Sequence, residues 1–367
     1  MGDYYSDYYQ FPTLEKISQT ASGERFKIEM VNNKLLMAFM SMFLGLFLPT
    51  LAMSADGAER MDLTNHWVGF VSVAIFTATE FLPGDAASLL LGQQATESNL
   101  KNLRHNMGLD RHPVERYTVW IKNAVQGDLG MAARGGATIN SMVKSRLPNS
   151  ALLAAVAFII AVPTSLLGGV LAGTRPDTKL DRILSIGSLL AISIPEFIIG
   201  VILMMVFATK LGWFPSSSIL LPGETILGSP KILVLPTLTI TGALFAYILR
   251  MARANVIEVM ESNYVRTAIL KGLSMRRVVF KHVLPNAMIP TITVIANNVG
   301  WMFGGIIVVE FVFAYPGIGS LLIMAIDTRD MRMLQSTALV IAAIYAFANL
   351  AADLLYGLLN PRVRVGQ

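Results

Sequence analysis

The amino-acid sequence predicts an all-α polytopic membrane protein. The 367 residues are 54% hydrophobic and only 14% charged, and the mean hydropathy is +0.57. Soluble domains carry about 25% charged residues, so the composition argues strongly against a water-soluble globule. Apolar runs of roughly 20 residues recur along the chain, each long enough to cross about 30 Å of hydrocarbon. The alternating strands of an outer-membrane barrel are missing from the sequence.

Seven apolar segments are predicted to span the membrane. In order they are Leu35–Met53, Trp67–Leu82, Ala151–Ala172, Ile183–Ala208, Leu233–Met251, Ile289–Val312 and Thr337–Leu359. Several contain Pro or Gly, as at Pro163, Pro195 and Gly304-Gly305. Membrane helices tolerate these residues when neighbouring helices satisfy the freed backbone groups. We therefore expect kinked helices that pack closely.

The first segment admits three interpretations. Lys34, the apolar run that follows it and the small residues near Ala52 and Ala55 have the order of a signal peptide, although 33 residues precede them. A true extra helix, an interfacial or re-entrant helix and a processed segment therefore all stay open. We adopt the extra helix as the working interpretation.

Lys and Arg residues in the short connections set the orientation, because positive charge is retained in the cytoplasm. The net charge of +5 accordingly reflects loop placement rather than nucleic-acid binding. Basic residues are concentrated at 173–182, at 250–285 and in the C-terminal tail, which we place in the cytoplasm. The connections 83–150, 211–231 and 314–334 then lie outside, as does the N-terminus if all seven segments span.

Residues 255–285, called the polar loop below, are far more polar than their surroundings and have a helical pattern. Apolar and charged residues alternate helically from Glu258 to Ala268, Gly272 suits a left-handed helix end, and Ser274 suits the cap of a second helix. Pro285 is expected to end that second helix. We expect two short helices, joined at the glycine, that lie parallel to the membrane.

The polar loop contains recognisable strings in a fixed order. They are Tyr264-Val265-Arg266-Thr267-Ala268, Lys271-Gly272-Leu273-Ser274, Arg276-Arg277-Val278 and His282-Val283-Leu284-Pro285-Asn286-Ala287. These strings resemble the coupling-helix motif of ATP-binding-cassette (ABC) importer membrane subunits, specifically the dipeptide/oligopeptide/nickel branch. Arg266 and Thr267 depart from the general Glu-Ala-Ala of that motif but resemble the peptide branch, where Tyr-Val-Arg-Thr-Ala is usual.

The resemblance extends from about Trp67 to Val365. Further matching fragments are Leu82-Pro83-Gly84-Asp85, Gly127-Asp128-Leu129-Gly130, Arg146-Leu147-Pro148-Asn149-Ser150, Tyr315-Pro316-Gly317-Ile318-Gly319 and Asn360-Pro361-Arg362. Each fragment is weak alone, whereas the ordered set is specific. It implies a six-helix permease domain over residues 67–365, with an extracytoplasmic loop at 83–150 and a cytoplasmic coupling loop at 255–285. Residues 1–66 would add a tail and the extra N-terminal helix.

The resemblance implies the membrane subunit of an ATP-driven importer that forms the path for peptides or similar small solutes. The sequence lacks a Gly-x-x-x-x-Gly-Lys-Ser/Thr phosphate loop, so the chain is not expected to be an enzyme. Two ATPase subunits would carry ATP and Mg. The other implied partners are a second permease subunit, usually a different chain, a soluble substrate-binding protein and membrane lipid, in a bacterial or archaeal cytoplasmic membrane.

No cofactor, metal or nucleic acid is expected to bind this chain. It contains no cysteine, which excludes disulfides, thiolate nucleophiles and cysteine metal sites. Its four histidines are scattered without the spacing of metal ligands.

The residues expected to contact the ATPase lie in the polar loop. They are Tyr264, Arg266, Thr267, Ala268, Gly272, Leu273, Arg276, Arg277, Leu284 and Pro285. The basic members can pair with carboxylates on the ATPase or with anionic lipid headgroups, and the sequence leaves both roles open.

Acidic residues in or beside the apolar segments form a second candidate set. They are Glu80, Glu196, Glu310 and Asp353. A charge at a helix centre costs about 2.5–3.5 kcal/mol on insertion scales, so such side chains should face water or a partner. One hypothesis is that Glu196, Glu310 and Asp353 line the translocation path and attract a cationic group such as a peptide amine. The alternative places Glu80 at the membrane interface and pairs Asp353 with a base such as Arg362.

Two other classes of function fit the sequence less well. An ion-coupled secondary transporter would use the acidic residues as relays, but it predicts two halves of similar hydropathy, which are missing. An intramembrane hydrolase needs a nucleophile elbow or a His-Glu-x-x-His helix, and the sequence has neither.

Overall fold

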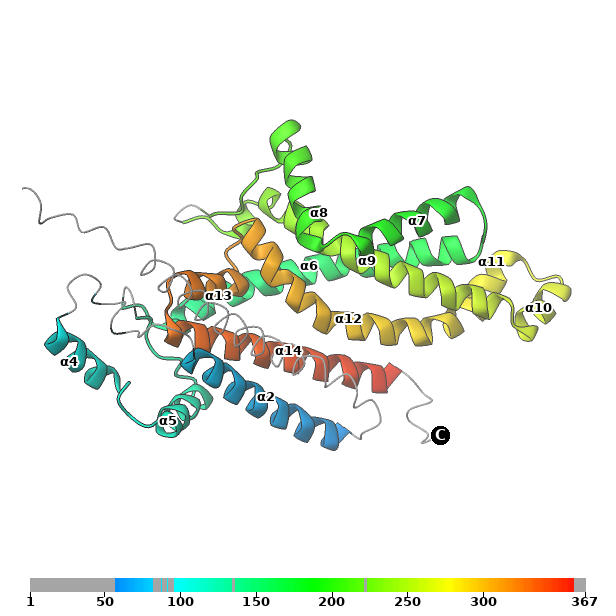
Figure 1. The fold of residues 1–367 in the computed structure, drawn as a ribbon. Coiled ribbons are helices and arrows are strands. Elements are labelled where there is room, and N and C mark those ends of the chain that lie inside the picture. Colours follow the sequence, from blue (N-terminus) through cyan, green and yellow to red (C-terminus); the bar gives the residue numbers. More distant parts are fainter. Residues whose placement is uncertain are drawn as a thin grey trace, which may run out of the picture.

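The computed structural model describes residues 57–81, 96–133, 136–220 and 223–359, together with the single positions 87 and 91. Throughout this range the chain forms helices and connections, with one isolated bridge between Met131 and Thr138 (Figure 1). The predicted all-α class is confirmed. The first predicted segment, Leu35–Met53, lies outside the described residues.

The helices follow one another in a simple order. They are α2 (Gly57–Glu80), α4 (Glu97–Met107), α5 (Pro113–Val125), α6 (Ile139–Gly173), α7 (Lys179–Ser193), α8 (Glu196–Leu203), the π-helix η3 (Met204–Lys210), the short 3-10 helix η4 (Ile226–Gly228), α9 (Lys231–Met260), α10 (Asn263–Leu270), α11 (Met275–Val278), the π-helix η5 (Val279–Val283), α12 (Leu284–Val312), α13 (Ile318–Asp327) and α14 (Met331–Leu359).

Several of these helices are long and apolar enough to cross a membrane. Within the described residues they are α6, α9, the continuous stretch Met275–Val312 and the stretch Met331–Ala352, to which the bent pair of α7 with α8–η3 can be added. The apolar part of α2, Trp67–Glu80, is shorter. Each predicted segment from Trp67 onward therefore coincides with a helix or a helix pair.

Helix α9 is the centre of the bundle, and α6 packs along it (Figure 1). In its most apolar window 72% of α9 is buried, against 28–33% for the other continuous spans. The contact with α6 is very close. A Cβ added at Gly169 would lie 2.6 Å from the Cβ of Ala252 and 2.8 Å from the carbonyl oxygen of Leu249. Small residues of this kind let membrane helices approach closely enough for backbone contact.

Helix α12 packs on α9, and α14 packs in turn on α12. Helix α12 is joined to α9 by a buried hydrogen bond, 3.0 Å long, from Asn255 Nδ2 to Thr291 Oγ1. Helix α14 runs beside α2 (Figure 1), where Val71 and Ile75 of α2 pack against Ala342. In the bundle, α6 and α12 pack on α9, α14 packs on α12, and α2 packs on α14.

The predicted segment Ile183–Ala208 is broken rather than kinked. Helix α7 ends at Ser193 and α8 begins at Glu196, and the two axes differ by 106°. The cause is local, because Pro195 has no backbone N–H and its ring disfavours the helical conformation at the residue before it. Ile194 is accordingly extended, with φ −98° and ψ 126°.

The bundle has two ends with different contents. At one end Asp181, at the start of α7, pairs with Arg253, near the end of α9 and close to the polar loop. At the other end Arg146, in the early part of α6, donates a hydrogen bond to Ser320 of α13. This arrangement agrees with the alternation inferred from the basic residues, with 173–182 and the polar loop on one side and 314–334 on the other.

The long connection 83–150 is helical in much of its described part. It contains α4 and α5, and α6 begins at Ile139, earlier than the predicted start at Ala151. Tertiary packing stabilises this extension, because Ile139 and Val143 are buried in one cluster with Leu321 of α13. Glu80 of α2 forms an ion pair with Arg116 of α5, so the carboxylate is paired at the edge of the bundle.

Replacing Gly169 by alanine should destabilise the bundle, because the added Cβ would meet backbone and side chain of α9 at less than contact distance. Gly187→Ala is the matched control, since no atom lies within 4 Å of the added Cβ. We expect a thermal unfolding midpoint in detergent that falls by several degrees for Gly169→Ala and does not fall for Gly187→Ala. Equal midpoints would contradict the assigned role of the α6–α9 contact.

Candidate functional site

The polar loop begins inside α9 and contains one separate short helix. Glu258, expected in the first loop helix, belongs to α9, which continues to Met260. Helix α10 then runs from Asn263 to Leu270 and is followed by Gly272 in the left-handed conformation, with φ +78°. The predicted glycine turn is confirmed, and Ser274 stands at the N-cap position of α11, although its side chain makes no capping hydrogen bond there.

The prediction that Pro285 ends the second loop helix is wrong. Helix α11, the π-helix η5 and α12 form one continuous helical stretch from Met275 to Val312. Pro285 lies in the first turn of α12, directly after the π-helical turn Val279–Val283. A wider turn before a proline changes the hydrogen-bond register, and a first-turn position needs no backbone N–H. Only α10 is therefore a free-standing helix of the loop.

A buried apolar cluster beneath α10 fixes the polar loop to the bundle. Its buried members are Val256 of α9, Val265 and Ala268 of α10, Val278 and Val283 of the following turns, and Ala287 of α12. Val170 of α6 and Leu273 of the glycine turn pack against it. Helix α10 thus rests on the ends of three long helices and cannot move independently of them without exposing this cluster to water.

The predicted contact residues divide into an exposed and a buried group. Tyr264, Arg266, Thr267, Gly272, Arg276, Arg277 and Pro285 are exposed. Ala268 is buried, and Leu273 and Leu284 are partly buried. The buried group therefore shapes the loop from beneath, whereas the exposed group is available to a partner.

Several exposed apolar side chains of the polar loop were not among the predicted residues. Leu270, at the end of α10, is 80% exposed, and Phe280, on η5, is 71% exposed. Ile269 and Met275 are exposed as well. The available signal was the helical period, because Val265 and Ala268 fill the inner face of α10 and leave Leu270 outside it. Motif matching did not select these residues because they lie between the matching strings.

Glu310, at the opposite end of the bundle, is fully buried and links α12 to α6 and α13. Its contacts with Ser150, Gly319 and Ser320 are called the Glu310 joint below. Its carboxylate accepts hydrogen bonds from the Ser150 hydroxyl at 2.5 Å and from the backbone N–H groups of Gly319 at 2.7 Å and Ser320 at 3.2 Å. The last two groups are orphan donors in the first turn of α13, so the carboxylate satisfies a helix N-terminus. Glu310 is 0% exposed in its own subunit, which favours a structural role over the predicted path-lining role.

Two of the motif fragments quoted above meet at this joint. The Asn149 side chain donates to the Pro316 carbonyl, and the Tyr315 hydroxyl donates to the Asn149 carbonyl, both at 2.8 Å. A Cβ at Gly317 would collide with the Glu310 carboxylate. The spacing of Arg-Leu-Pro-Asn-Ser and Tyr-Pro-Gly-Ile-Gly therefore reflects the docking of α13 on α6.

A known family matches most of the chain. The family described as "Binding-protein-dependent transport system inner membrane component" matches residues 165–365, and the description of its N-terminal part matches residues 66–154. The chain belongs to this family. The resemblance drawn from the sequence motifs is confirmed.

Curated relatives of this permease are themselves transport permeases. It is 33% identical over 300 residues to the Oligopeptide transport system permease protein AppB of Bacillus subtilis, with 80% of this chain and 94% of the relative covered. It is 34% identical over 294 residues to the Glutathione transport system permease protein GsiC of Escherichia coli O6:H1, with the same shares covered. The chain is a multi-pass permease subunit of an ABC importer and not an enzyme. Such a subunit works with ATPase subunits, a binding protein and a second permease.

Glu196 differs from Glu310 in its surroundings. It is partly buried in the first turn of α8, directly after the Ile194–Pro195 break, and a Cβ at Gly305 of α12 would collide with its carboxylate. Among the described residues the Glu196 carboxylate has no hydrogen-bond or ion-pair partner. Asp353 lies on α14, but its side chain and Arg362 are outside the described part of the chain.

A cavity of about 590 Å³ lies between the long connection 83–150 and the ends of α2 and α14. It is lined by α2, α5, the α4–α5 turn and the start of α14, with Thr79, Asp110, Trp120 and Gln335 among its wall residues. The turn is well defined, because Gly108 caps α4 in the left-handed conformation and His105 Nδ1 lies 2.8 Å from Asp110 Oδ2. This contact lowers the pKa of the exposed Asp110. The described part of the long loop is therefore folded against the ends of α2 and α14 and encloses a cavity with them.

Ser150→Ala should loosen α13, because Ser150 Oγ both donates to Glu310 and accepts a 2.8 Å hydrogen bond from the Ile318 N–H. We expect faster amide hydrogen exchange in residues 318–327, measured by mass spectrometry on the purified permease. Ser145→Ala is the control, since the exposed Ser145 hydroxyl bonds only within its own helix turn. Unchanged hydrogen exchange in α13 for Ser150→Ala would show that the Ser150 hydrogen bonds do not hold α13 in place.

Proposed function

We propose that the permease forms the translocation path for peptides or similar small solutes in a bacterial or archaeal cytoplasmic membrane. Two ATPase subunits carrying ATP and Mg, and a second permease that is a different chain, complete the transporter. The names of the relatives, oligopeptide and glutathione permeases, support a peptide-like solute. One observation carries the coupling part of the proposal: a short helix, α10, that exposes apolar and basic side chains while its inner face is fixed to three long helices.

The docking contact with the ATPase is assigned to the outer surface of the polar loop. Leu270 and Ile269 are the apolar side chains at the end of α10, and Tyr264 adds an aromatic side chain that is 46% exposed. Apolar side chains of this kind provide affinity when they enter a pocket, whereas basic side chains at the rim chiefly contribute orientation. We assign Arg266, Arg276 and Arg277 to the rim.

The buried cluster determines how motion passes into the membrane. Closure of the ATPase dimer displaces α10, and the packing of Val265 and Ala268 requires the ends of α9 and α12 to follow. Close-packed interiors have low compressibility and transmit displacement instead of absorbing it. Rotation of α9 and α12 then alternates access to the path.

The path itself is proposed to run past Glu196. The carboxylate lies where the α7–α8 break meets Gly305, and intramembrane ionisable residues usually face water or a partner. A negative charge there favours solutes with a protonated amine. Glu310 and Asp353, predicted to share this role, are not assigned to it. The outer entrance is assigned to the structured long loop, where the soluble binding protein docks.

Gly272→Val should abolish ATP-driven uptake while leaving membrane insertion intact. No atom lies within 4 Å of a Cβ at this position, so the cost is the left-handed backbone, which β-branched residues adopt poorly. Gly272→Asn is the matched control, because Asn tolerates this conformation. The measurement is solute uptake into vesicles that contain the complete transporter. Full uptake by Gly272→Val, or uptake by the wild type without ATP, would reject the coupled import mechanism.

Leu270→Asp should weaken attachment of the ATPase, because a charge would replace an apolar docking side chain. We expect the ATPase yield in copurification to fall by about tenfold or more, the scale on which central interface residues act. Leu227→Asp is the control, since Leu227 is 76% exposed on η4, outside the polar loop. Equal ATPase yields for both variants would remove Leu270 from the interface.

Glu196→Gln tests the charged path, since it keeps the shape of the side chain and removes its charge. We expect a larger loss of uptake for a dipeptide with a free amine than for its N-acetylated form. Loss of the same size for both solutes would dismiss the role of the charge.

A further inference from the structure

Helix α7 is attached to its own subunit by very few buried side chains. Only Asp181 and Ser188 are buried in its 15 residues. Its apolar side chains are largely exposed, as shown by Leu180, Ile183, Ile186, Leu189, Leu190 and Ile192. The Ser188 hydroxyl donates to the Ser185 carbonyl within the same helix. Asp181 is therefore the buried side chain through which α7 binds another helix.

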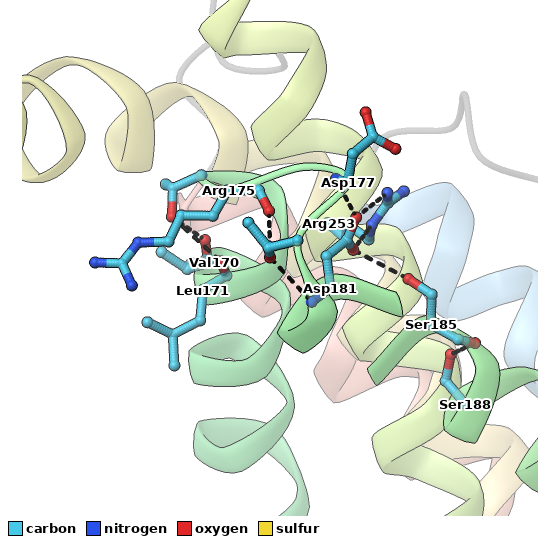
Figure 2. A network of polar contacts seen from close by, with 10 residues as sticks. Val170, Leu171, Arg175, Asp177, Asp181, Ser185, Ser188 and Arg253 are labelled. Carbon is cyan, nitrogen blue, oxygen red and sulfur yellow. Dashed lines mark hydrogen bonds and ion pairs between the residues drawn. The ribbon is translucent and has the colours of Figure 1, made fainter. Parts of the chain in front are cut away.

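Asp181 is held by a two-pronged ion pair with Arg253 of α9. Arg253 Nε lies 2.5 Å from Asp181 Oδ1, and Arg253 Nη2 lies 2.8 Å from Asp181 Oδ2 (Figure 2). The Asp177 N–H and the Ser185 hydroxyl donate to the same two oxygens at 3.0 and 3.1 Å. Asp181, Arg253, Asp177 and Ser185 are called the Asp181 clamp below. Paired, charge-assisted bonds of this geometry are both strong and directional.

The turn between α6 and α7 contributes two hydrogen bonds to Asp181. Asp177 has φ +63°, a left-handed conformation that is uncommon for residues other than glycine. In this conformation its N–H points at Asp181 (Figure 2). The Thr178 hydroxyl accepts from the Asp181 N–H at 3.3 Å. A strained residue persists where the surrounding contacts over-determine it. These hydrogen bonds therefore hold the turn in one conformation.

The clamp lies next to the structure that supports the polar loop. Arg253 precedes Val256 by one turn of α9, and Val256 is buried against Val265 and Ala268 of α10. At the same level, a Cβ at Gly173 would lie 2.9 Å from the carbonyl oxygen of Arg253. Contacts thus run without interruption from α10 to α9 and from α9 to the start of α7.

We infer that the Asp181 clamp transmits movement of the polar loop to the bent α7–α8 pair, which makes Asp181 and Arg253 positioning residues for transport. The inference rests on the proposed function. Displacing α10 moves the end of α9, and the clamp obliges the start of α7 to follow. Because the chain turns by 106° after Ser193, rotation of α7 displaces α8 and with it Glu196. Without the clamp, α7 follows α9 only through the α6–α7 turn and the remaining packing, so less of the displacement reaches α8.

The test compares ATP hydrolysis with solute uptake in vesicles that contain the complete transporter and its binding protein. For Asp181→Asn we expect copurifying subunits, ATP hydrolysis within about twofold of the wild type, and uptake per ATP about tenfold lower. Arg253→Lys keeps the charge but loses the planar fork, so its loss should be intermediate.

Two controls separate transmission from general stability. Ser188→Ala alters the other buried residue of α7, and Arg250→Gln removes an exposed basic group from α9. Both should keep the wild-type uptake per ATP. If Asp181→Asn does not assemble, Arg253→Lys decides on the same ratio. An unchanged ratio in the deciding variant overturns the inference, as does a parallel fall in hydrolysis and uptake. Failure of ATP-driven uptake in the wild type would instead reject the proposed function.

Discussion

The close contact between α6 and α9 is the constraint on which the rest of the permease depends. Gly169 and Gly173 bring the two backbones so near that a single methyl group would not fit between them. In hydrocarbon, burying apolar side chains between helices gives no hydrophobic gain, so association relies on close packing and hydrogen bonds. With α6 fixed on α9, the turn after α6 and the start of α7 are brought within reach of Arg253.

Polar joints then fix the elements at the two ends of this pair. One end has the Asp181 clamp and the apolar cluster beneath α10, and the other has the Glu310 joint that holds α13. The middle of the bundle is mainly apolar packing. This division explains how one subunit can pass movement between its faces, because each end is a rigid assembly and the Ile194–Pro195 break supplies the change of direction.

The sequence predicted the helices far better than the joints between them. Apolar length located every described span, and the left-handed turn at Gly272 followed from the residue type alone. Pro285 misled the prediction, since a proline is compatible with a helix when it falls in the first turn after a π-helical turn. The sequence indicated a kink at Pro195, whereas the extended Ile194 before this proline separates α7 from α8 completely.

The candidate site shows the same limit. Motif spacing selected Arg266 and Gly272, which are exposed, and also Ala268, which lies underneath the loop. It missed Leu270, because exposure depends on which face of α10 meets Val256. Glu310 appeared as an intramembrane charge and a path candidate, whereas its donors come from residues 150 and 319–320, which only the fold brings together.

The Glu310 joint can be completed only once residues 319 and 320 have been made. Two of the donors to its carboxylate, the N–H groups of Gly319 and Ser320, lie after Glu310 in the chain. Until α13 folds back against α12, these two hydrogen bonds to the Glu310 carboxylate cannot form. Docking of α13 therefore completes the hydrogen bonding of a carboxylate that the preceding part of the chain, through Ser150, satisfies only in part.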